Sequence, residues 1–362
     1  MLPSILTHLQ RLVAFDTRNP PRAIGTDGIF DYLRAQLPGF AFDLRDHGAG
    51  AVSLLAVRGS PSRVFNVHID TVPDAPGWSA DPFALGVDDQ RATGLGACDI
   101  KGAAACLLAA AQASTGAAAL LFSSDEEAND PRCIRAFLGS DHGFAQAIVA
   151  EPTGCKVVLA HRGIASVQMR FVGNAGHASG VNALADNALH QAVRWGARAL
   201  DCVANEAHRE FDGLSGLRFN IGRIEGGIKA NVIAPSADVR FGFRPLPSHD
   251  VDELHARFHD CAHAPPASYT EVFRGPALPA GTPAQASARH GQARALADDL
   301  GLPIGAAVDF WTEAALFSAA GLTTLVYGSG DIAQAHAADE WVALEQLRAA
   351  ATTYRRLLEI EQ

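Results

Sequence analysis

The sequence predicts an α/β protein: a mostly parallel sheet with helices on both faces, into which a ferredoxin-like α+β domain is inserted. Apolar runs without alternation, as in strands covered on both faces, recur at 64–69, 118–122, 147–150 and 322–328. Between 166 and 273 polar and apolar residues alternate instead, as in a sheet with one face in water. The 362 residues exceed the size at which one hydrophobic core usually stops growing, so two domains are expected.

The first predicted domain is discontinuous and comprises 1–165 and 275–362. An amphipathic helix is expected at its start because apolar residues repeat there at helical spacing: Ile5, Leu9, Leu12 and Val13. A second helix is expected near 27–37, and a third in the Ala/Leu-rich stretch that ends at about residue 113. A strand near 51–57 precedes the first buried run.

The inserted domain is predicted at 166–274. Its elements are expected in the order β-α-β-β-α-β, at 166–172, 182–203, 217–224, 237–243, 250–261 and 269–273. This order is that of a ferredoxin-like sandwich.

The composition is that of an ordinary globular protein, with 48% hydrophobic and 19% charged residues. The formal charge of −10 and the lack of any Lys/Arg run argue against a nucleic-acid partner. The six cysteines are scattered without a Cys-x-x-Cys pair, which favours reduced thiols and a cytoplasmic location. No apolar run reaches about 18 residues, and the N-terminus lacks a targeting pattern, so no membrane partner is expected.

Acids and a histidine stand at the ends of three buried runs: His68 and Asp70, then Asp125-Glu126-Glu127, then Glu151. The carboxyl ends of parallel strands meet at one edge of a sheet, and acids gathered there repel one another unless cations lie between them. Period-two geometry places Asp70 on the same side as His68, where it can orient the imidazole. This pattern predicts a metal site. For single residues, a structural histidine and a solvated acidic turn remain alternatives.

Two loop residues extend this set. Asp99 lies in the glycine-rich segment 94–102 before a predicted helix, where it is either the helix N-cap or a metal ligand. The glycines of this segment lack the spacing of a nucleotide-binding fingerprint. His336 follows the last buried run, and taken alone it is an ordinary loop histidine.

Taken in order, these motifs resemble the M20 family of metal-dependent peptidases and deacylases, over nearly the whole chain. The resemblance implies two divalent metal ions per subunit, zinc or cobalt. The ligands it implies are Asp99 between the two ions, His68 and Glu151 on one ion, and Glu127 and His336 on the other. Glu126 would be the general base. A water between two such cations loses its proton near neutral pH and attacks a polarised amide carbonyl, while Glu126 carries the proton to the leaving nitrogen.

The resemblance also assigns roles within the inserted domain. His177 matches the family's histidine that stabilises the tetrahedral oxyanion, with a plain loop histidine as the alternative. Lys229, Asn231 and Arg244 match positions that contact substrate in relatives. The fork of Arg244 suits a carboxylate, although a surface ion pair would also explain it. In relatives this domain forms a dimer, so we expect a homodimer in which His177 completes the partner's active site.

The segments 310–314 and 328–336 most resemble the branch of the family that deacetylates N-acetyl-L-citrulline or N-acetyl-L-ornithine in arginine biosynthesis. The expected substrate is therefore a small N-acetylated amino acid, and we favour the citrulline derivative. Glu313 would face the side chain or nitrogen of that substrate, with a solvated loop acid as the alternative. A dipeptidase, a succinyl-diaminopimelate desuccinylase and a non-catalytic binding protein on this scaffold remain alternative functions.

Overall fold

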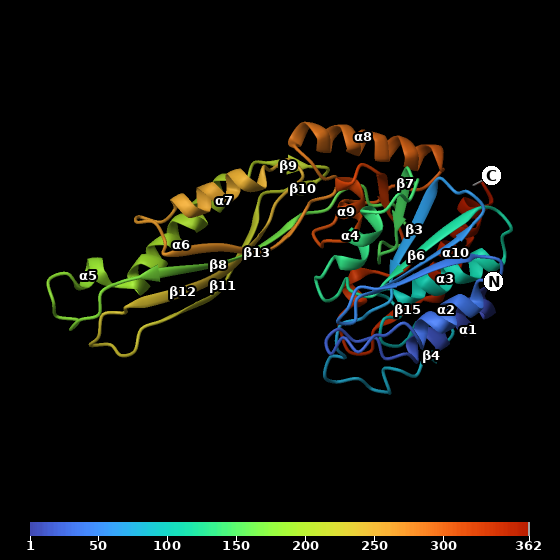
Figure 1. The fold of residues 1–362 in the computed structure, drawn as a ribbon, viewed down its shortest axis with the longest axis horizontal. Helices are drawn as coiled ribbons and strands as arrows, with labels where there is room; N and C mark the ends of the chain where they lie inside the picture. The colour runs from blue at the N-terminus through green and yellow to red at the C-terminus, as the bar shows by residue number, and fades with distance from the viewer. Residues whose placement is uncertain (361–362) are drawn as a thin grey trace. The chain divides into compact units, whose positions relative to one another are not determined.

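The computed structural model describes residues 1–360, which form two compact units (Figure 1). Among the described residues, unit 1 comprises 1–159, 291–305 and 312–360, and unit 2 comprises 160–290 and 306–311. The segment predicted as an insertion, 166–274, lies within unit 2. All six cysteines are free thiols.

A six-stranded sheet forms the centre of unit 1. Its order is β1-β2-β6-β3-β7-β14, in which β6, β3, β7 and β14 are parallel and β2 runs antiparallel to both of its neighbours, β1 and β6. The bounds are β1 Ala41–Asp46, β2 Val52–Arg58, β3 Arg63–His68, β6 Ala118–Ser123, β7 Gln146–Val149 and β14 Thr323–Val326. A small second sheet contains β4 Gly86–Val87, β5 Arg91–Thr93 and β15 Trp341–Ala343.

Helices cover both faces of the six-stranded sheet, as the sequence predicts. Figure 1 shows α4 and α9 on one side, and α1, α2, α3 and α10 on the other. The bounds are α1 Leu2–Val13, α2 Ile29–Gln36, α3 Lys101–Gln112, α4 Arg132–Leu138, α9 Ala314–Ala319 and α10 Leu344–Glu359, with a 3-10 turn, η1, at Ile332–Gln334. Helix α8, Pro283–Asp299, contributes residues to both units.

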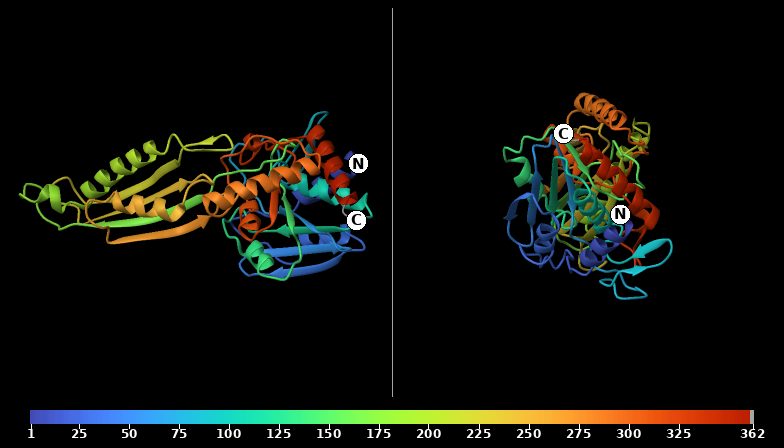
Figure 2. Two further views of the ribbon diagram at one scale, coloured as in Figure 1. Left: turned by 90° about the horizontal axis from the view of Figure 1, so that it is seen from above. Right: turned by 90° about the vertical axis from the view of Figure 1, so that its right-hand side faces the viewer.

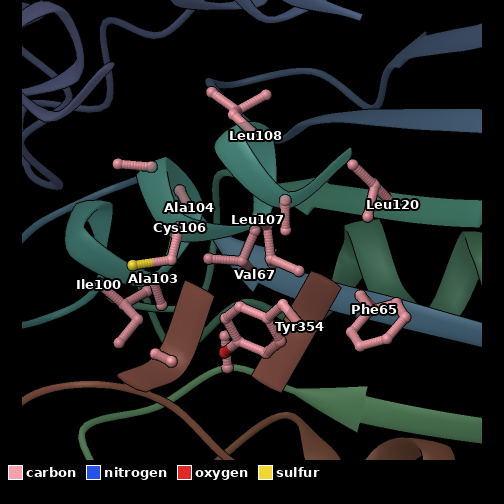
Figure 3. Close-up of a cluster of buried hydrophobic side chains, with 14 of the residues drawn as sticks. Phe65, Val67, Ile100, Ala103, Ala104, Cys106, Leu107, Leu108, Leu120 and Tyr354 are labelled. Atoms are coloured by element: carbon pink, nitrogen blue, oxygen red, sulfur yellow. The ribbon is translucent and has the colours of Figure 1, made fainter. Parts of the chain in front are cut away.

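The core of unit 1 forms where α3 and α10 pack against each other and against the sheet. Figure 3 shows the buried side chains of Leu107, Val67 and Tyr354 gathered there. Tyr354 lies edge-on to Phe65 at 5.9 Å, and its hydroxyl donates to a buried backbone carbonyl, so burial leaves no polar atom of this ring unpaired. At Gly102 a Cβ would lie 2.4 Å from a carbonyl oxygen of the preceding loop, so only glycine allows the loop to pack this closely against α3.

Unit 2 is a β-α-β-β-α-β sandwich, and the predicted ferredoxin-like order is confirmed. The antiparallel sheet has the order β11-β12-β8-β13. The bounds are β8 Ile164–Val172, α6 Ala188–Asn205, β11 Arg218–Gly226, β12 Ser236–Arg244, α7 Val251–Asp260 and β13 Ser268–Gly275. Both helices lie on one face of the sheet (Figure 2), and the other face carries polar side chains. A hairpin of β9 Glu210–Phe211 and β10 Leu214–Ser215 follows α6.

The single helix predicted at 182–203 is wrong in one respect, because the structure has two. A short helix, α5 Ala183–Asp186, ends before Asn187, which adopts an extended conformation. The side chain of Asn187 accepts hydrogen bonds from the backbone amides of Leu189 and His190, so it is the N-cap of α6. Across residues 1–360, none of the helices combines the length and apolar character needed to cross a bilayer.

Candidate metal centre

Three parallel strands of unit 1 deliver acids and a histidine to one edge of the sheet. His68 is the last residue of β3, while Glu127 follows β6 and Glu151 follows β7. Two loops add Asp99, just before α3, and His336, just after η1. The site therefore lies at the carboxyl end of the strands, where open α/β sheets bind their ligands.

These five side chains form two groups that share Asp99. The first group is His68, Asp99 and Glu151, and the second is Asp99, Glu127 and His336. Within each group the ligand atoms all lie within 4.8 Å of one another. Each oxygen of Asp99 faces a different histidine: Oδ1 lies 3.1 Å from Nε2 of His68, and Oδ2 lies 3.4 Å from Nε2 of His336. One oxygen of Asp99 therefore faces each of the two groups.

The electrostatics of the two groups favour cations. Burial raises the pKa of Glu151 well above its ordinary value, and the neighbouring acids raise it further. Burial also raises the pKa of Glu127. Hydrogen bonds to Asp99 and Glu127 raise the pKa of His336 to about 10. Acids this close together need positive charge, which protons or metal ions supply, and the N/O donors present suit zinc, cobalt or manganese.

Asp70 links ligands of both groups. Nδ1 of His68 lies 3.1 Å from the Asp70 backbone carbonyl and 3.5 Å from Oδ1, so Nε2 is the ring nitrogen turned towards Asp99. The other carboxylate oxygen, Oδ2, accepts hydrogen bonds from Asn19 at 2.9 Å and from the Glu127 backbone amide at 3.0 Å. Asp70 therefore fixes both the His68 ring and the start of the acidic turn.

Glu126 adjoins both groups and, among residues 1–360, belongs to neither. Burial raises its pKa well above the ordinary value, and Glu127 and Glu151 reinforce that rise, while His68 opposes it. The side chain is half-buried. The alternative explanation, in which Glu126 lies in a solvated acidic turn, does not fit these partly buried surroundings. The arrangement places one glutamate at a candidate ligand position and leaves its neighbour available for a proton.

The N-cap explanation for Asp99 is not supported. Helix α3 begins at Lys101 with Ile100 as its N-cap residue, and no side chain caps it. The glycine-rich loop before α3 does not present its amides to a nucleotide either, because those of Gly96, Cys98 and Asp99 donate to the carboxylate of Glu340.

Glu313 is buried near the ends of β3 and β6, with 2% of its surface exposed. The hydroxyl of Ser123 donates to its carboxylate at 2.9 Å. Burial raises the pKa of Glu313 to about 8, and the carboxylate of Asp125 reinforces the rise. The solvated loop acid considered above is therefore excluded, and the substrate role remains a hypothesis.

The other sequence-predicted residues belong to unit 2, where they form two separate sets. His177 and Asn231 lie together in exposed loops at one end of the sheet, where the Ala178 amide donates to the Asn231 carbonyl at 3.1 Å. The Nδ1 atom of His177 lies 2.7 Å from the hydroxyl of Ser179. Lys229 is in the same connection between β11 and β12.

Arg244 is at the opposite end of that sheet, as the last residue of β12. It lines a pocket of about 460 Å³ on the polar face, together with Arg218 and Arg240. Arg218 is its direct cross-strand partner, and the like charges are partly offset by the carboxylate of Asp309, which lies 3.6 Å from Arg218. Arg244 has no ion pair within 4 Å among the described residues, which argues against the surface ion pair.

Three of these contact residues escaped the sequence analysis: Asn19, Arg218 and Glu340. Asn19 lies in a proline-rich loop, and Glu340 follows His336 by four residues. Arg218 occupies a polar position of an alternating strand. No sequence motif marks any of the three, because each contacts a residue that is remote from it in the sequence.

Comparison with known proteins gives consistent matches. The sequence model of peptidase family M20/M25/M40 matches residues 64–360. The chain is 63% identical over 359 residues to an N-acetyl-L-citrulline deacetylase of Xanthomonas campestris pv. campestris, covering 99% of this chain and 98% of that protein. An acetylornithine deacetylase of Edwardsiella ictaluri is 28% identical over 313 residues, covering 83% and 78%.

Solved structures match the same fold. The aminopeptidase PepT of Bacillus cereus superposes with a TM-score of 0.74 at 17% identity, covering 99% of this chain and 98% of that one. A Bacillus subtilis protein described as a dinuclear metal binding peptidase from the M20 family superposes with a TM-score of 0.65 at 14% identity, covering 99% and 97%.

Proposed function

The chain belongs to peptidase family M20/M25/M40, and from that membership we propose that it hydrolyses the N-acetyl amide of N-acetyl-L-citrulline. The products are acetate and citrulline, and the reaction belongs to arginine biosynthesis in the cytoplasm. The 63% identity to an N-acetyl-L-citrulline deacetylase supports this substrate over N-acetyl-L-ornithine. The observation that carries the chemistry is the pair of ligand groups that share Asp99 beside Glu126.

We propose that the two groups hold two divalent cations, zinc or cobalt. His68 and Glu151 would complete the shell of one ion, and Glu127 and His336 that of the other, with Asp99 common to both. When bound, such ions lower the pKa of a water molecule and polarise an amide carbonyl. The residues fit this role, since the ligand atoms are within reach of one ion in each group and His68 is held by Asp70 in the required ring orientation.

Glu126 is the general base of the proposed reaction. It accepts a proton from the attacking water and donates it to the nitrogen of the leaving amino acid. Its carboxylate belongs to neither ligand group of the described residues, so it is free to carry the proton between the water and the leaving nitrogen. Glu127 stays fixed meanwhile, because its amide is bound to Asp70 and its carboxylate contacts His336 at 3.0 Å.

The unit-2 candidates are proposed to act on the substrate from two different subunits. Arg244 would bind the carboxylate of the substrate, while His177 would stabilise the oxyanion, with Asn231 and Lys229 in contact nearby. Strand β12 spans nine residues, so its two ends are separated by roughly 27 Å at about 3.4 Å per residue. An N-acetylated amino acid is far shorter, so Arg244 and His177 of one chain cannot hold the same molecule.

A homodimer resolves this separation, because the partner's unit 2 then supplies the second set of residues. Unit 2 has surfaces suited to pairing. Strand β11 is a nine-residue edge of its sheet, and α6 exposes the apolar side chains of Val193 and Leu200. A two-fold interface would bury both the edge and the helix face.

A substrate panel tests this function. Chelated enzyme, reloaded with zinc or with cobalt, is assayed for hydrolysis of N-acetyl-L-citrulline, N-acetyl-L-ornithine, N-succinyl-diaminopimelate and a dipeptide. The proposal requires kcat/KM to be highest for N-acetyl-L-citrulline and to collapse without metal. A preference for the dipeptide or the succinyl substrate would identify a different activity of the family, and tight binding without turnover would identify a binding protein.

A further inference from the structure

We propose that Glu340 is a positioning residue, which holds the loops of Asp99 and His336 together so that both cation sites form. This inference rests on the metal centre proposed above. No motif in the sequence assigns a role to Glu340, and it is not itself a member of either ligand group among the described residues.

The carboxylate of Glu340 accepts three hydrogen bonds, all from the loop before α3. Its Oε1 atom accepts hydrogen bonds from the amides of Cys98 at 2.8 Å and Asp99 at 2.9 Å, and its Oε2 atom accepts one from Gly96 at 3.0 Å. The backbone carbonyl of Glu340 accepts a fourth bond, from Gly94 at 2.9 Å. Only 2% of the residue is exposed.

Only a carboxylate satisfies this arrangement. Three amide N–H groups converge on the two oxygens of Glu340, and hydrogen bonds to an ionised acceptor are stronger than bonds to a neutral one. Without the carboxylate these buried donors would have no acceptor, and the loop would have to open to water. The bond to the Asp99 amide is direct, so movement of the loop displaces the side chain that both groups share.

The same residue is tied to the second loop ligand. Glu340 follows His336 by four residues, and the two loops meet again where the Cys98 thiol donates to the Asp331 carbonyl at 3.2 Å. His336 itself has a φ of +58°, which a non-glycine residue keeps only when its surroundings impose it. Unlike His68, these two ligands do not extend from a strand, so their placement depends on such contacts.

The test is the affinity of metal-free protein for zinc, measured by competition with a chromophoric chelator. Glu340→Gln replaces one acceptor oxygen by an NH₂ group that faces amide N–H groups. We expect its zinc affinity to fall about 10–100-fold at both sites, as when other groups that orient metal ligands are removed. The absorption spectrum of the cobalt-loaded variant should change as well, because the ligand geometry changes.

Glu206→Gln is the matched control. Glu206 is another buried glutamate with several partners, Arg257, His249 and Arg209, but it lies in unit 2 and touches no candidate ligand. It should lose stability and keep the wild-type zinc affinity. If Glu340→Gln does not fold, Glu340→Asp, which keeps both oxygens on a shorter side chain, is measured in its place.

The outcomes separate the two proposals. A folded Glu340 variant with wild-type zinc affinity at both sites overturns the positioning role and leaves the metal centre intact. An equal loss of affinity in Glu206→Gln also overturns it, because general destabilisation would then explain the effect. A wild-type chain that binds no zinc contradicts the proposed function and this inference together.

Discussion

Glu126 and Glu127 are neighbours in the sequence with different surroundings in the structure. Glu127 contacts His336 and is anchored through its amide to Asp70, whereas Glu126 belongs to neither ligand group among the described residues. Identical side chains can therefore serve different purposes, one as a ligand and the other as a base.

A substitution at Glu126 separates these purposes. Glu126→Gln keeps the shape of the side chain and removes its ability to accept a proton, so kcat should fall about 10²–10⁴-fold. Metal content, measured by mass spectrometry of the dialysed protein, should remain that of the wild type. Near-normal turnover, or loss of metal, would show that Glu126 is not the base.

At the residue scale, the sequence predicts the candidate metal ligands but not the residues that hold those ligands in place. His68, Glu127 and Glu151 are recognisable because each follows a buried apolar run. Glu340 is not, because its role arises from hydrogen bonds to a loop about 240 positions earlier. Such contacts depend on tertiary folding, and no spacing rule expresses them.

At the scale of helices and strands, periodicity predicted most of the elements, and the differences have local causes. The helix expected from residue 182 is broken at Asn187, whose side chain bonds with the following amides and so starts a new helix. Of the two roles that the sequence leaves open for Asp99, the structure does not support the helix cap, because Ile100 is the N-cap residue of α3 and Asp99 lies one position too early.

The ends of α6 and α7 are joined by a buried ionic cluster. Glu206, which follows α6, accepts hydrogen bonds from Arg257 at 2.6 Å and His249 at 3.1 Å. Burial lowers the pKa of His249, although Glu206 opposes the shift. Burial alone would raise the pKa of Glu206, but the hydrogen bonds and positive charges of Arg257, His249 and Arg209 together outweigh it, so the net shift is downward.

These shifts predict a loss of stability in acid. A folded-state pKa below the unfolded value means that the unfolded chain binds more protons, so stability is present at higher pH and is lost as pH falls. The His249 contribution should be lost from about pH 6.5 downward, and that of Glu206 from about pH 4.5 downward.

Urea unfolding of the whole chain between pH 8 and pH 4 measures this effect. The free energy of unfolding should decrease as the pH is lowered. In His249→Gln, the decrease that begins near pH 6.5 should be absent. His263→Gln, which changes an exposed histidine after α7, should leave the profile unchanged. An identical profile in His249→Gln would show that this histidine does not link α6 to α7.

At the scale of the whole molecule, the apolar runs give way after residue 165 to alternating polar and apolar residues. This change predicts a second domain, and the structure has a compact unit that contains that segment. The sequence could not predict that His177 and Arg244 stand at opposite ends of one sheet, because this depends on the antiparallel register of β12 with β8. That separation is the strongest argument for an active site shared by two chains.

Subunit exchange tests the shared site. His177→Ala and Glu126→Gln should each be nearly inactive alone, since removing an oxyanion donor costs about 10²–10³ in rate. A mixed dimer contains one site with both residues intact. Random pairing of equal amounts should restore about a quarter of the wild-type activity. Verified mixed dimers that remain inactive, with both variants folded and metal-loaded, would place His177 outside the partner's site.

Two cations that share Asp99 are proposed to enable deacetylation together. Metal-free protein is titrated with zinc while acetate release from N-acetyl-L-citrulline is followed in the same sample. The wild type should bind two equivalents per chain, with turnover appearing as they bind. Folded Asp99→Ala should bind both ions at least about 10²-fold more weakly and release no acetate. Full activity without metal, or Asp99→Ala that keeps both ions at wild-type affinity, would contradict the account.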